Sequence, residues 1–233
     1  MKSRILFSVA ASLLFGANLS YAVAVTNGSF EDQTPGQGVW AGTSGTSDGQ
    51  WNGSVQGWNT GTGTAGTWRP GADMFTSIPD GLQVAYLLTG SNIWQVTTEV
   101  LQDGYTYTLS AMAGTRDNAA LGSNTTFAGA KIELMTGSTV LASATSATPA
   151  EGGWVSVTTL GYLFDGTANP TLVGAPLTIR LSTPAGIGSQ TNFDQISLTA
   201  VPLPAAAWLF GSALLGLGWT KRFRRQSQDA LIA

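Results

Sequence analysis

The sequence predicts an all-β protein whose strands form a β-sandwich, and three observations lead to this fold class. Segments in which apolar and polar residues alternate recur along the chain, turn-forming residues separate them, and residues 25–200 contain no convincing amphipathic helix. Thr, Val, Ile and aromatic residues, which suit a pleated surface, are enriched in these segments. Many short strands joined by polar turns predict two packed antiparallel sheets.

Two segments show the alternation most clearly. Residues 105–112 place aromatic and aliphatic side chains on one face and mostly hydroxyl side chains on the other. Residues 176–182 turn three aliphatic side chains inward, beginning with Leu177, and turn Arg180 outward. The other expected strands are 82–88, 93–100, 130–135, 154–164 and 192–200. Residues 32–79 are instead rich in Gly, Thr and Ser, so we expect long loops there, with short strands around four tryptophans.

Composition excludes several kinds of chemistry. The chain has no cysteine and no histidine, which removes disulfides, Ser-His-Asp triads, Cys-His pairs and His-ligated zinc. Residues 25–200 contain four basic and twelve acidic side chains, a formal net charge of −8. Phosphate-backbone binding needs clustered cations, so a nucleic-acid partner is not expected.

Residues 1–24 have the pattern of a secretory signal peptide. Lys2 and Arg4 form a basic start before an apolar stretch, and small residues allow cleavage after Ala24, with Ala22 as second choice. A retained N-terminal membrane helix is the alternative. The remaining 25–200 segment is long enough for one domain with its own core.

A second apolar run lies near the C-terminus. No charge occurs from Leu203 to Trp219, and a helix of this length reaches roughly 25 Å, the lower limit for crossing a bilayer core. Pro202 and Pro204 mark its start. A cluster of four cations follows and should keep that end cytoplasmic. These cations are Lys221, Arg222, Arg224 and Arg225. A buried core helix is the alternative, although such helices rarely end in clustered cations.

Residues 201–225 resemble the PEP-CTERM sorting signal of exported bacterial proteins, in its VPLPA variant. The motif consists of Val201, Pro202, Leu203 and Pro204. The apolar run and the basic cluster follow in the order typical of the family, whereas residues 226–233 extend beyond it as a short cytoplasmic tail. The resemblance implies recognition by an exosortase, a membrane protease-transpeptidase. We therefore expect export across the inner membrane, transient anchoring by the helix, and a final place at the cell surface or outside the cell.

The central domain, residues 25–200, resembles galactose-binding-like jelly rolls, including family 4, 9 and 22 carbohydrate-binding modules. The likeness depends on Asn27–Glu31 near the start, "LQDGYTYTLSAMAG" in the middle and Asn192–Leu198 near the end. It departs at Gln195, where a second acidic residue is common. The resemblance implies a sandwich whose first and last strands run near each other.

Many proteins of this group hold a structural calcium at that junction, and the residues here permit one. Asp194 is expected on the same side of its strand as the core residues Ile196 and Leu198, which is unfavourable for a carboxylate unless it is paired or metal-bound. Glu31 could supply a second carboxylate, and carbonyl groups near Asn27 could complete the shell. No cofactor is required. The alternative is that Asp194 lies at a frayed strand end, where it caps turn N–H groups or meets Arg180.

Tryptophans are candidate sugar platforms, because an aromatic face covers a pyranose while polar groups fix its hydroxyls. Trp94 and Trp154 alternate with polar residues inside strands, so we assign both to packing. Most tryptophans of a disulfide-free sandwich lie in the core, and one or two of the loop tryptophans are expected to be exposed. The candidates are Trp40, Trp51, Trp58 and Trp68, with Asn59 and Asp73 as polar companions.

These observations predict an exported, non-catalytic surface or matrix protein that associates with extracellular polysaccharide. A purely structural surface protein without a soluble ligand is the main alternative. A glycoside hydrolase is a third reading, since it needs only two carboxylates, but no spacing in the sequence singles out a pair.

Overall fold

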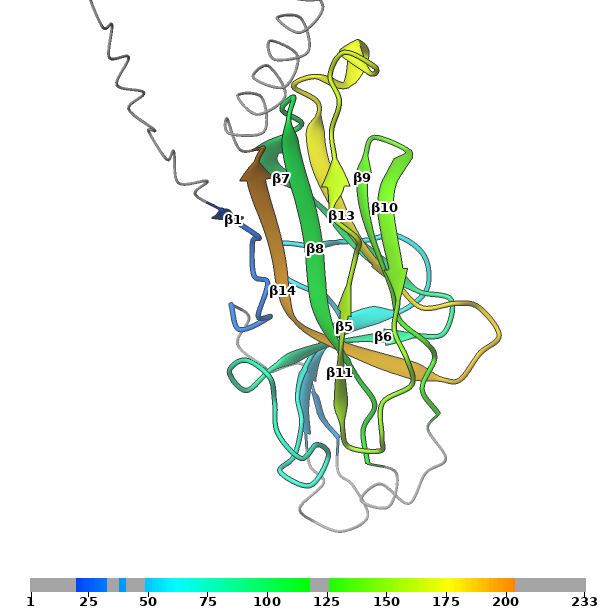
Figure 1. Cartoon of the computed structure of the whole chain (residues 1–233). Helices are drawn as coiled ribbons and strands as arrows, with labels where there is room; N and C mark the ends of the chain where they lie inside the picture. The colour runs from blue at the N-terminus through cyan, green and yellow to red at the C-terminus, as the bar shows by residue number, and fades with distance from the viewer. Residues whose placement is uncertain (1–19, 33–37, 41–48, 118–125, 204–233) are drawn as a thin grey trace, which may run out of the picture. The chain divides into compact units, whose positions relative to one another are not determined.

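A computed structural model describes most of the central domain and parts of its flanks. The described residues are 20–32, 38–40, 49–117 and 126–203. Within them, two β-sheets of nine and five strands enclose a common core, and the only helix is one 3-10 turn at Pro170–Leu172. Figure 1 shows β8 and β14 side by side in the larger sheet, with β9 and β13 of the smaller sheet beyond them. The predicted all-β sandwich is confirmed.

The nine-stranded sheet runs in the order β11-β8-β14-β6-β5-β3-β2, with β1 paired to β14 and β12 paired to β8. Its strands are β1 (Tyr21–Val23), β2 (Gly38–Trp40), β3 (Gly49–Asn52), β5 (Ala65–Arg69), β6 (Val84–Leu88), β8 (Tyr105–Gly114), β11 (Trp154–Thr158), β12 (Tyr162–Leu163) and β14 (Gln190–Pro202). The five-stranded sheet runs in the order β10-β9-β13-β7-β4. Its strands are β4 (Asn59–Thr60), β7 (Asn92–Val100), β9 (Lys131–Thr136), β10 (Thr139–Thr145) and β13 (Pro176–Ser182).

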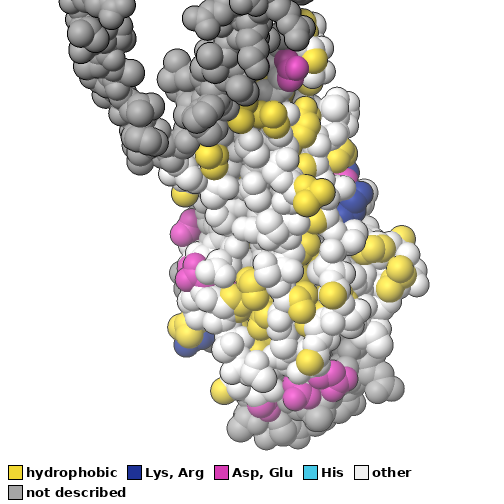
Figure 2. Space-filling view, viewed as in Figure 1, with side chains coloured by type: hydrophobic (Ala, Val, Ile, Leu, Met, Phe, Trp, Pro, Cys, Tyr) yellow, Lys and Arg dark blue, Asp and Glu magenta, His cyan; other side chains and the backbone are white. Residues whose placement is uncertain are grey.

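The core lies between the sheets and follows the alternation read from the sequence. Tyr107 and Leu109 of β8 are fully buried, as are Leu177, Ile179 and Leu181 of β13. Burial of each large apolar side chain contributes about 1.5–3 kcal/mol, so these two strands alone supply much of the stability. Over the face in Figure 2, charged side chains are sparse and apolar ones are scattered among uncharged polar groups.

The alternation of β14 is interrupted in its middle. Phe193 and Ile196 both belong to the core cluster although they are three residues apart, and Gln195 between them has a positive φ of 51°. A left-handed residue inside a strand is typical of a β-bulge and changes which side chains share a face. From Asp194 onward the expected alternation does hold, because Asp194, Ile196 and Leu198 are buried while Gln195 and Ser197 between them are exposed or half-buried.

The first and last strands are neighbours, as the resemblance implied. In β1, Tyr21 lies opposite Ala200 and Val23 opposite Leu198. β1 thus falls inside the segment predicted as a signal peptide, whose remaining residues 1–19 lie outside the described residues. Pro204 and the predicted anchor, basic cluster and tail also lie outside them. In the described part of the chain, no helix combines the length and the apolar character that a membrane crossing requires.

Candidate functional site

Aromatic side chains cover the outer face of the nine-stranded sheet, on the side away from the core. Ala113 of β8 belongs to the core cluster, so the next residue, Gly114, lies on the opposite face, where it pairs with Trp154 of β11. On the same outer face, Asn192 of β14 lies opposite Tyr86 of β6. These pairs come from strands that are adjacent in the sheet order β11-β8-β14-β6.

These outward-facing pairs form a row across the sheet. The row continues to β5, where Trp68 lies opposite Val84 of β6. Strand order therefore sets Trp154 at one end of the row and Trp68 at the other, with Asn192 and Tyr86 between them. We call this surface the aromatic face. It is defined by the rings of Trp68, Phe75, Tyr86 and Trp154.

Phe75 joins the two tryptophans from the connection between β5 and β6. Its ring centroid lies 4.9 Å from that of Trp154 in a stacked arrangement and 6.2 Å from that of Trp68 in an edge-on arrangement. The connection is held by backbone hydrogen bonds, because the Met74 carbonyl accepts from a residue just beyond β8 and the Thr76 N–H donates to a residue just before β11. Aromatic pairs at these distances are favourable beyond the area they bury.

Gly114 allows the indole of Trp154 to lie directly on the sheet. A Cβ at this position would come within 2.6 Å of the Trp154 ring, closer than real side-chain contacts allow. The ring is fixed from the other side as well, since Trp154 Nε1 donates to the Ser77 carbonyl at 2.8 Å. A glycine in the strand interior is thus a close-approach position.

Three polar groups border the aromatic face. The Arg116 guanidinium lies 5.9 Å from the Trp68 ring centroid, and burial lowers the pKa of Arg116 to about 10, so it stays charged at neutral pH. Burial raises the pKa of Tyr86, which keeps its phenol protonated. Asn192 accepts from Gln190 Nε2 at 3.0 Å. Trp68 and Phe75 are themselves buried, so the half-buried rings of Tyr86 and Trp154 are the parts of the aromatic face that reach solvent.

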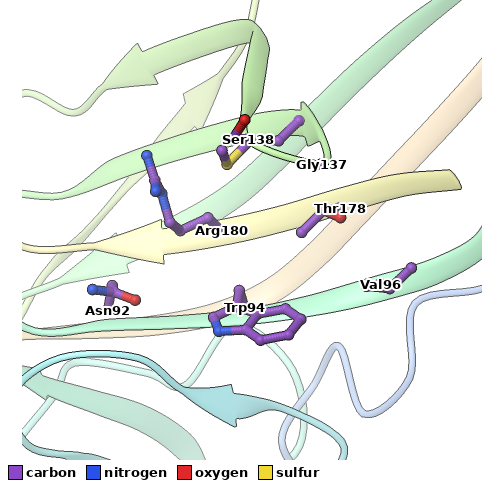
Figure 3. Close-up of a pocket in the computed structure, with 8 residues that line it drawn as sticks. Asn92, Trp94, Val96, Gly137, Ser138, Thr178 and Arg180 are labelled. Atoms are coloured by element: carbon purple, nitrogen blue, oxygen red, sulfur yellow. The ribbon is translucent and has the colours of Figure 1, made fainter. Parts of the chain in front are cut away.

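A groove of about 480 Å³ lies on the outer face of the five-stranded sheet (Figure 3). Trp94 and Val96 of β7, Thr178 and Arg180 of β13, and the turn between β9 and β10 line it. Figure 3 shows the Trp94 indole lying along β7 on the side of Val96. The assignment of Trp94 to packing is therefore wrong, because this half-buried ring forms a wall of the groove instead.

Arg180 of the groove also belongs to an ion cluster with a buried carboxylate. Glu133 accepts from Lys131 Nζ at 2.8 Å and from Arg180 Nε at 2.6 Å, and its side chain is 3% exposed. Burial alone would raise the pKa of Glu133, but the hydrogen bonds from the two cations outweigh it and hold the pKa below its usual range. Glu133 is therefore a fixed anion rather than a proton donor.

The residues expected to bind calcium meet where the first and last strands join. Glu31 accepts from the backbone N–H groups of Leu82 and Gln83, and Asp194 accepts from the N–H of Asp80 at 2.9 Å. Both carboxylates thus bind one turn. Burial raises the pKa of Asp194 to about 7, although backbone hydrogen bonds oppose this rise.

The side chain of Asn27 has other partners. Its amide donates to the Gln56 carbonyl at 2.8 Å and its oxygen accepts from the Asp32 N–H at 3.1 Å. The Arg180 alternative for Asp194 also does not hold, since the Arg180 Nε bonds Glu133. In the residues that the structure covers, no group of three or more acidic side chains is arranged to hold a metal.

Two of the tryptophans proposed as sugar platforms are buried. Trp58 is 8% exposed and belongs to the main core, with its ring 5.8 Å from that of Phe30. Trp68 is 3% exposed and belongs to the aromatic face. Neither presents an open ring surface to a polysaccharide.

The other sugar candidates are spread over different elements. Asn59 is exposed in β4 of the smaller sheet, whereas Asp73 is half-buried in the connection between β5 and β6. Trp40 and Trp51 lie in β2 and β3, and their side chains fall outside the described residues. The structure therefore does not bring the described candidates together.

Sequence reasoning missed most of the polar groups of the aromatic face. One signal was present, since Arg116 is one of only four cations in the central domain. Tyr86 alternates in step with Leu82, Val84 and Leu88, a pattern that by itself suggests an inward position. Gly114 and Asn192 gave no local signal, because their roles depend on which strands become neighbours.

Comparison with known families identifies the domain. A family model for HpiC1-like proteins, described as HpiC1 cyclase, matches residues 21–199. The chain belongs to the HpiC1-like cyclase family. The match extends over almost the entire sandwich of this HpiC1-like protein, from β1 into β14. A comparison with curated proteins gives no significant match.

Solved structures from Fischerella resemble the fold of this HpiC1-like protein. A cyclase from Fischerella sp. TAU matches with a TM-score of 0.64 and 22% identity, over 80% of this chain and 100% of that chain. The Stig cyclase Fisc from the same organism, in complex with (3Z)-3-(1-methyl-2-pyrrolidinylidene)-3H-indole, matches with a TM-score of 0.61 and 22% identity, over 79% and 100%. A cyclase from that organism in complex with 4-(1H-indol-3-yl)butan-2-one matches with a TM-score of 0.60 and 24% identity, over 79% and 100%.

These findings correct the predicted function. Carbohydrate-binding modules do occur among the structural matches, but with TM-scores of 0.43 or below. Membership in a cyclase family overturns the assignment as a non-catalytic matrix protein associated with polysaccharide. None of the comparisons supports the assignments to exosortase sorting and exopolysaccharide.

Proposed function

We propose that this HpiC1-like protein is a cyclase that closes a ring in a small aromatic substrate at the aromatic face. The observation that carries the proposal is the continuous series of ring contacts Trp68–Phe75–Trp154 beside the polar groups of Arg116 and Asn192. Family membership supports ring closure as the reaction. The indole ligands named for the Fischerella structures favour a substrate with a flat indole-like ring.

The aromatic face suits this chemistry. When an unsaturated chain closes onto the ring that carries it, one σ bond forms at the expense of one π bond and a proton moves from one carbon to another, so the product is an isomer. The rate of this step depends on holding the reacting atoms in contact. Aromatic faces attract positive charge, so they stabilise charge that develops on carbon as the bond forms. The protonated phenol of the half-buried Tyr86 is a neutral group that can hold a polar part of the substrate, whereas the Asn192 amide is buried and bonded to the Gly114 carbonyl and to Gln190.

The groove on the smaller sheet is a weaker candidate for catalysis. Among its described residues it has one aromatic wall, Trp94, and the nearby carboxylate of Glu133 is already held by two cations. Asp194 also does not suit the role of proton donor to a substrate, because it is fully buried and bonded to two backbone N–H groups.

The proposal is tested by incubating the purified full-length protein with a panel of indoles that carry a tethered unsaturated chain. A cyclase should convert at least one of them into an isomer of unchanged mass, detected by liquid chromatography with mass spectrometry and identified by NMR. The variant Trp154→Ala should lower the rate by roughly 10²-fold, since misplacing a positioned group costs about that much. The matched control Trp94→Ala removes the same side chain from the other sheet and should leave the rate unchanged.

Two results would contradict the proposal. The first is the absence of any isomer across the panel. The second is an activity that survives Trp154→Ala and is lost in Trp94→Ala, which would move catalysis to the groove.

We also propose that Glu31 and Asp194 hold a structural calcium ion. The oxygen atoms near them fit a hard cation, because Gln83 Oε1 is buried without a hydrogen-bond partner and Gln83 itself donates to Glu31. A bound cation would also favour the charged form of the buried Asp194. Among the described residues no third acidic side chain joins Glu31 and Asp194 in a metal-binding group, so amide and carbonyl oxygens would have to supply the remaining ligands.

Calcium removal gives a direct test of this site. We expect a chelator to lower the melting temperature of the wild-type protein and added calcium to restore it, because an ion that binds only the folded state stabilises it. In Glu31→Gln the melting temperature should no longer depend on the ion. A wild-type melting temperature that chelator leaves unchanged would remove the site.

The place of the protein in the cell is a further part of the proposal. The N-terminal pattern and the apolar C-terminal run favour export across the inner membrane, transient anchoring and a final place outside the cell. The finer assignment of the sandwich as a galactose-binding-like jelly roll rests on the motifs near Asn27 and Asp194. Fractionation of the producing cells tests the location, and recovery of the intact chain from the cytosol alone would contradict it.

A further inference from the structure

We propose that the groove on the five-stranded sheet is a second small-molecule site, separate from the aromatic face, for a flat aromatic ring that carries an anionic group such as a carboxylate. The groove and the aromatic face lie on the outer faces of different sheets, with the main core between them. The second site is therefore independent of the catalytic surface and goes beyond the proposed ring closure.

Strand register builds the groove as rows of side chains across three strands. In one row Arg180 of β13 lies opposite Trp94 of β7 on one side and Glu133 of β9 on the other. In the next row Thr178 lies opposite Val96 on one side and a methionine of β9 on the other. The first row is aromatic and charged, and the second is mainly apolar.

The apolar row and Trp94 together suit a flat ring. Val96 is 52% exposed, so a ring lying on the second row would remove apolar surface from water. Figure 3 shows the Trp94 indole beside this row, with Ser138 of the β9–β10 turn on the far side of β13. The volume of about 480 Å³ lies within the range of small-ligand sites.

The charged row determines which ligand charge the groove favours. Lys131 and Arg180 bring two positive charges to the single negative charge of Glu133, so this cluster has a net charge of +1. The surrounding domain, residues 25–200, has a formal net charge of −8. The cluster is thus a local positive spot beside the indole, and it favours an anion and disfavours a cation. The guanidinium of Arg180 lies next to Trp94 in the register, which places the anionic group and the ring at neighbouring positions.

The test uses calorimetric titration of the full-length protein with three probes that share one ring system. They are 2-naphthoate, the neutral 2-naphthalenemethanol and the cationic 2-naphthylmethylammonium. We expect 2-naphthoate to bind most tightly, the neutral probe to bind more weakly by about tenfold or more, because it loses one charge-assisted contact, and the cationic probe to bind more weakly still. Binding of 2-naphthoate should also weaken as salt is added.

Three variants test whether 2-naphthoate binds in the groove. Trp94→Ala removes a surface side chain and should weaken 2-naphthoate binding about tenfold or more. The variant Lys131→Gln keeps the ion pair of Glu133 with Arg180 but lowers the net charge of the cluster from +1 to 0, and it should therefore weaken the preference for the anionic probe. Trp154→Phe, on the aromatic face, is the matched control and should bind 2-naphthoate as the wild type does.

Three outcomes would overturn the proposal. They are no saturable binding of 2-naphthoate, equal affinity for all three probes, and an affinity that is lost in Trp154→Phe while Trp94→Ala keeps it. The third would place the probe on the aromatic face. Cyclase activity that Trp94→Ala leaves intact, measured in parallel, keeps this test separate from that of the proposed function.

Discussion

The missing side chain of Gly114 makes room for the Trp154 ring on the aromatic face. Because Gly114 has no Cβ, the Trp154 indole reaches the backbone of β8 and can stack on Phe75. A tryptophan at this place in a strand would otherwise point into solvent. The same geometry makes Gly114 sensitive to the smallest substitution.

We expect Gly114→Ala to displace the Trp154 ring and to destabilise the fold by about 1–3 kcal/mol, as for other overpacked positions. Near-ultraviolet circular dichroism would report the change in ring packing, and urea unfolding would report the stability. Gly174→Ala is a suitable control, because a Cβ there meets nothing within 4 Å although φ is +77°. That control should lose some stability to backbone strain but keep the aromatic signal. An unchanged aromatic signal in Gly114→Ala would contradict this account.

Asp194 is the described residue whose charge state should control stability near neutral pH. Its pKa rises from 3.8 to about 7 in the folded protein, because burial disfavours the charged carboxylate. Between these two pH values the folded state binds more protons than the unfolded state, so the free energy of unfolding falls as pH rises. A bound cation would oppose that fall, since it favours the charged form.

In the presence of chelator, we expect wild-type stability to decrease as the pH rises from about 4 to about 7. Asp194→Asn carries no titrating group and should show a shallower decrease over this window, although its baseline stability should be lower because an amide offers one acceptor to two backbone donors. Urea unfolding across the window measures both effects. Equal slopes in the two proteins would rule out Asp194 as the source.

At the scale of elements, β14 connects the parts of the larger sheet. Its first residues pair with β6, its last residues pair with β1, and it lies next to β8 along the sheet. Phe193 sits just before the bulge and is fully buried. The strand thus combines a core anchor, the calcium candidate Asp194 and the Asn192 amide of the aromatic face.

Phe193→Ala should destabilise the domain by about 3–5 kcal/mol, the usual cost of removing a buried phenylalanine. Ser197→Ala, a half-buried position of the same strand, should change stability by no more than about 0.5 kcal/mol. Denaturant midpoints of the two variants give the comparison. Similar midpoints would mean that β14 does not anchor the core.

The elements also show what the sequence could and could not predict. The inward side chains of β8 and β13 were predictable, because alternation is a local property and both strands keep it without a break. The conformation of the middle of β14 was not predictable, because Gln195 adopts a positive φ and glutamine is not a residue type that favours it. β5 lies in a Gly- and Thr-rich segment with no clear alternation, so Trp68 was assigned to a loop.

The candidate site was harder to predict than the fold for a related reason. Trp154, Asn192, Tyr86 and Trp68 become neighbours only through the order of four strands in one sheet, and that order depends on pairings between distant parts of the chain. Trp94 was placed in the core because alternation alone does not say which face of β7 is covered.

At the scale of the whole molecule, β1 closes the junction between the two ends of the domain. Tyr21 also donates from its hydroxyl to Glu99 of the other sheet at 2.8 Å. Cleavage after Ala24 would remove this strand, whereas a cut before Tyr21 would keep it. The position of the mature N-terminus therefore has a structural consequence.

We expect a chain that begins at residue 20 to melt at a higher temperature than one that begins at residue 25, because only the longer chain retains the pairs of β1 with β14. A loss of about 1 kcal/mol corresponds to a few degrees for a domain of this size. Mass spectrometry of the protein purified from the producing cells and their medium would show which form the cell keeps. Equal melting temperatures would mean that β1 adds nothing to the fold.

The late position of β14 in the chain has a consequence for biosynthesis. The strand that joins β6, β8 and β1 is the last one translated, so a ribosome must complete nearly the whole domain before the larger sheet can assemble. Until then the nascent polypeptide lacks the strand that connects β6, β8 and β1. The larger sheet therefore closes late in synthesis, and a chain that stays open until then would suit the export proposed above.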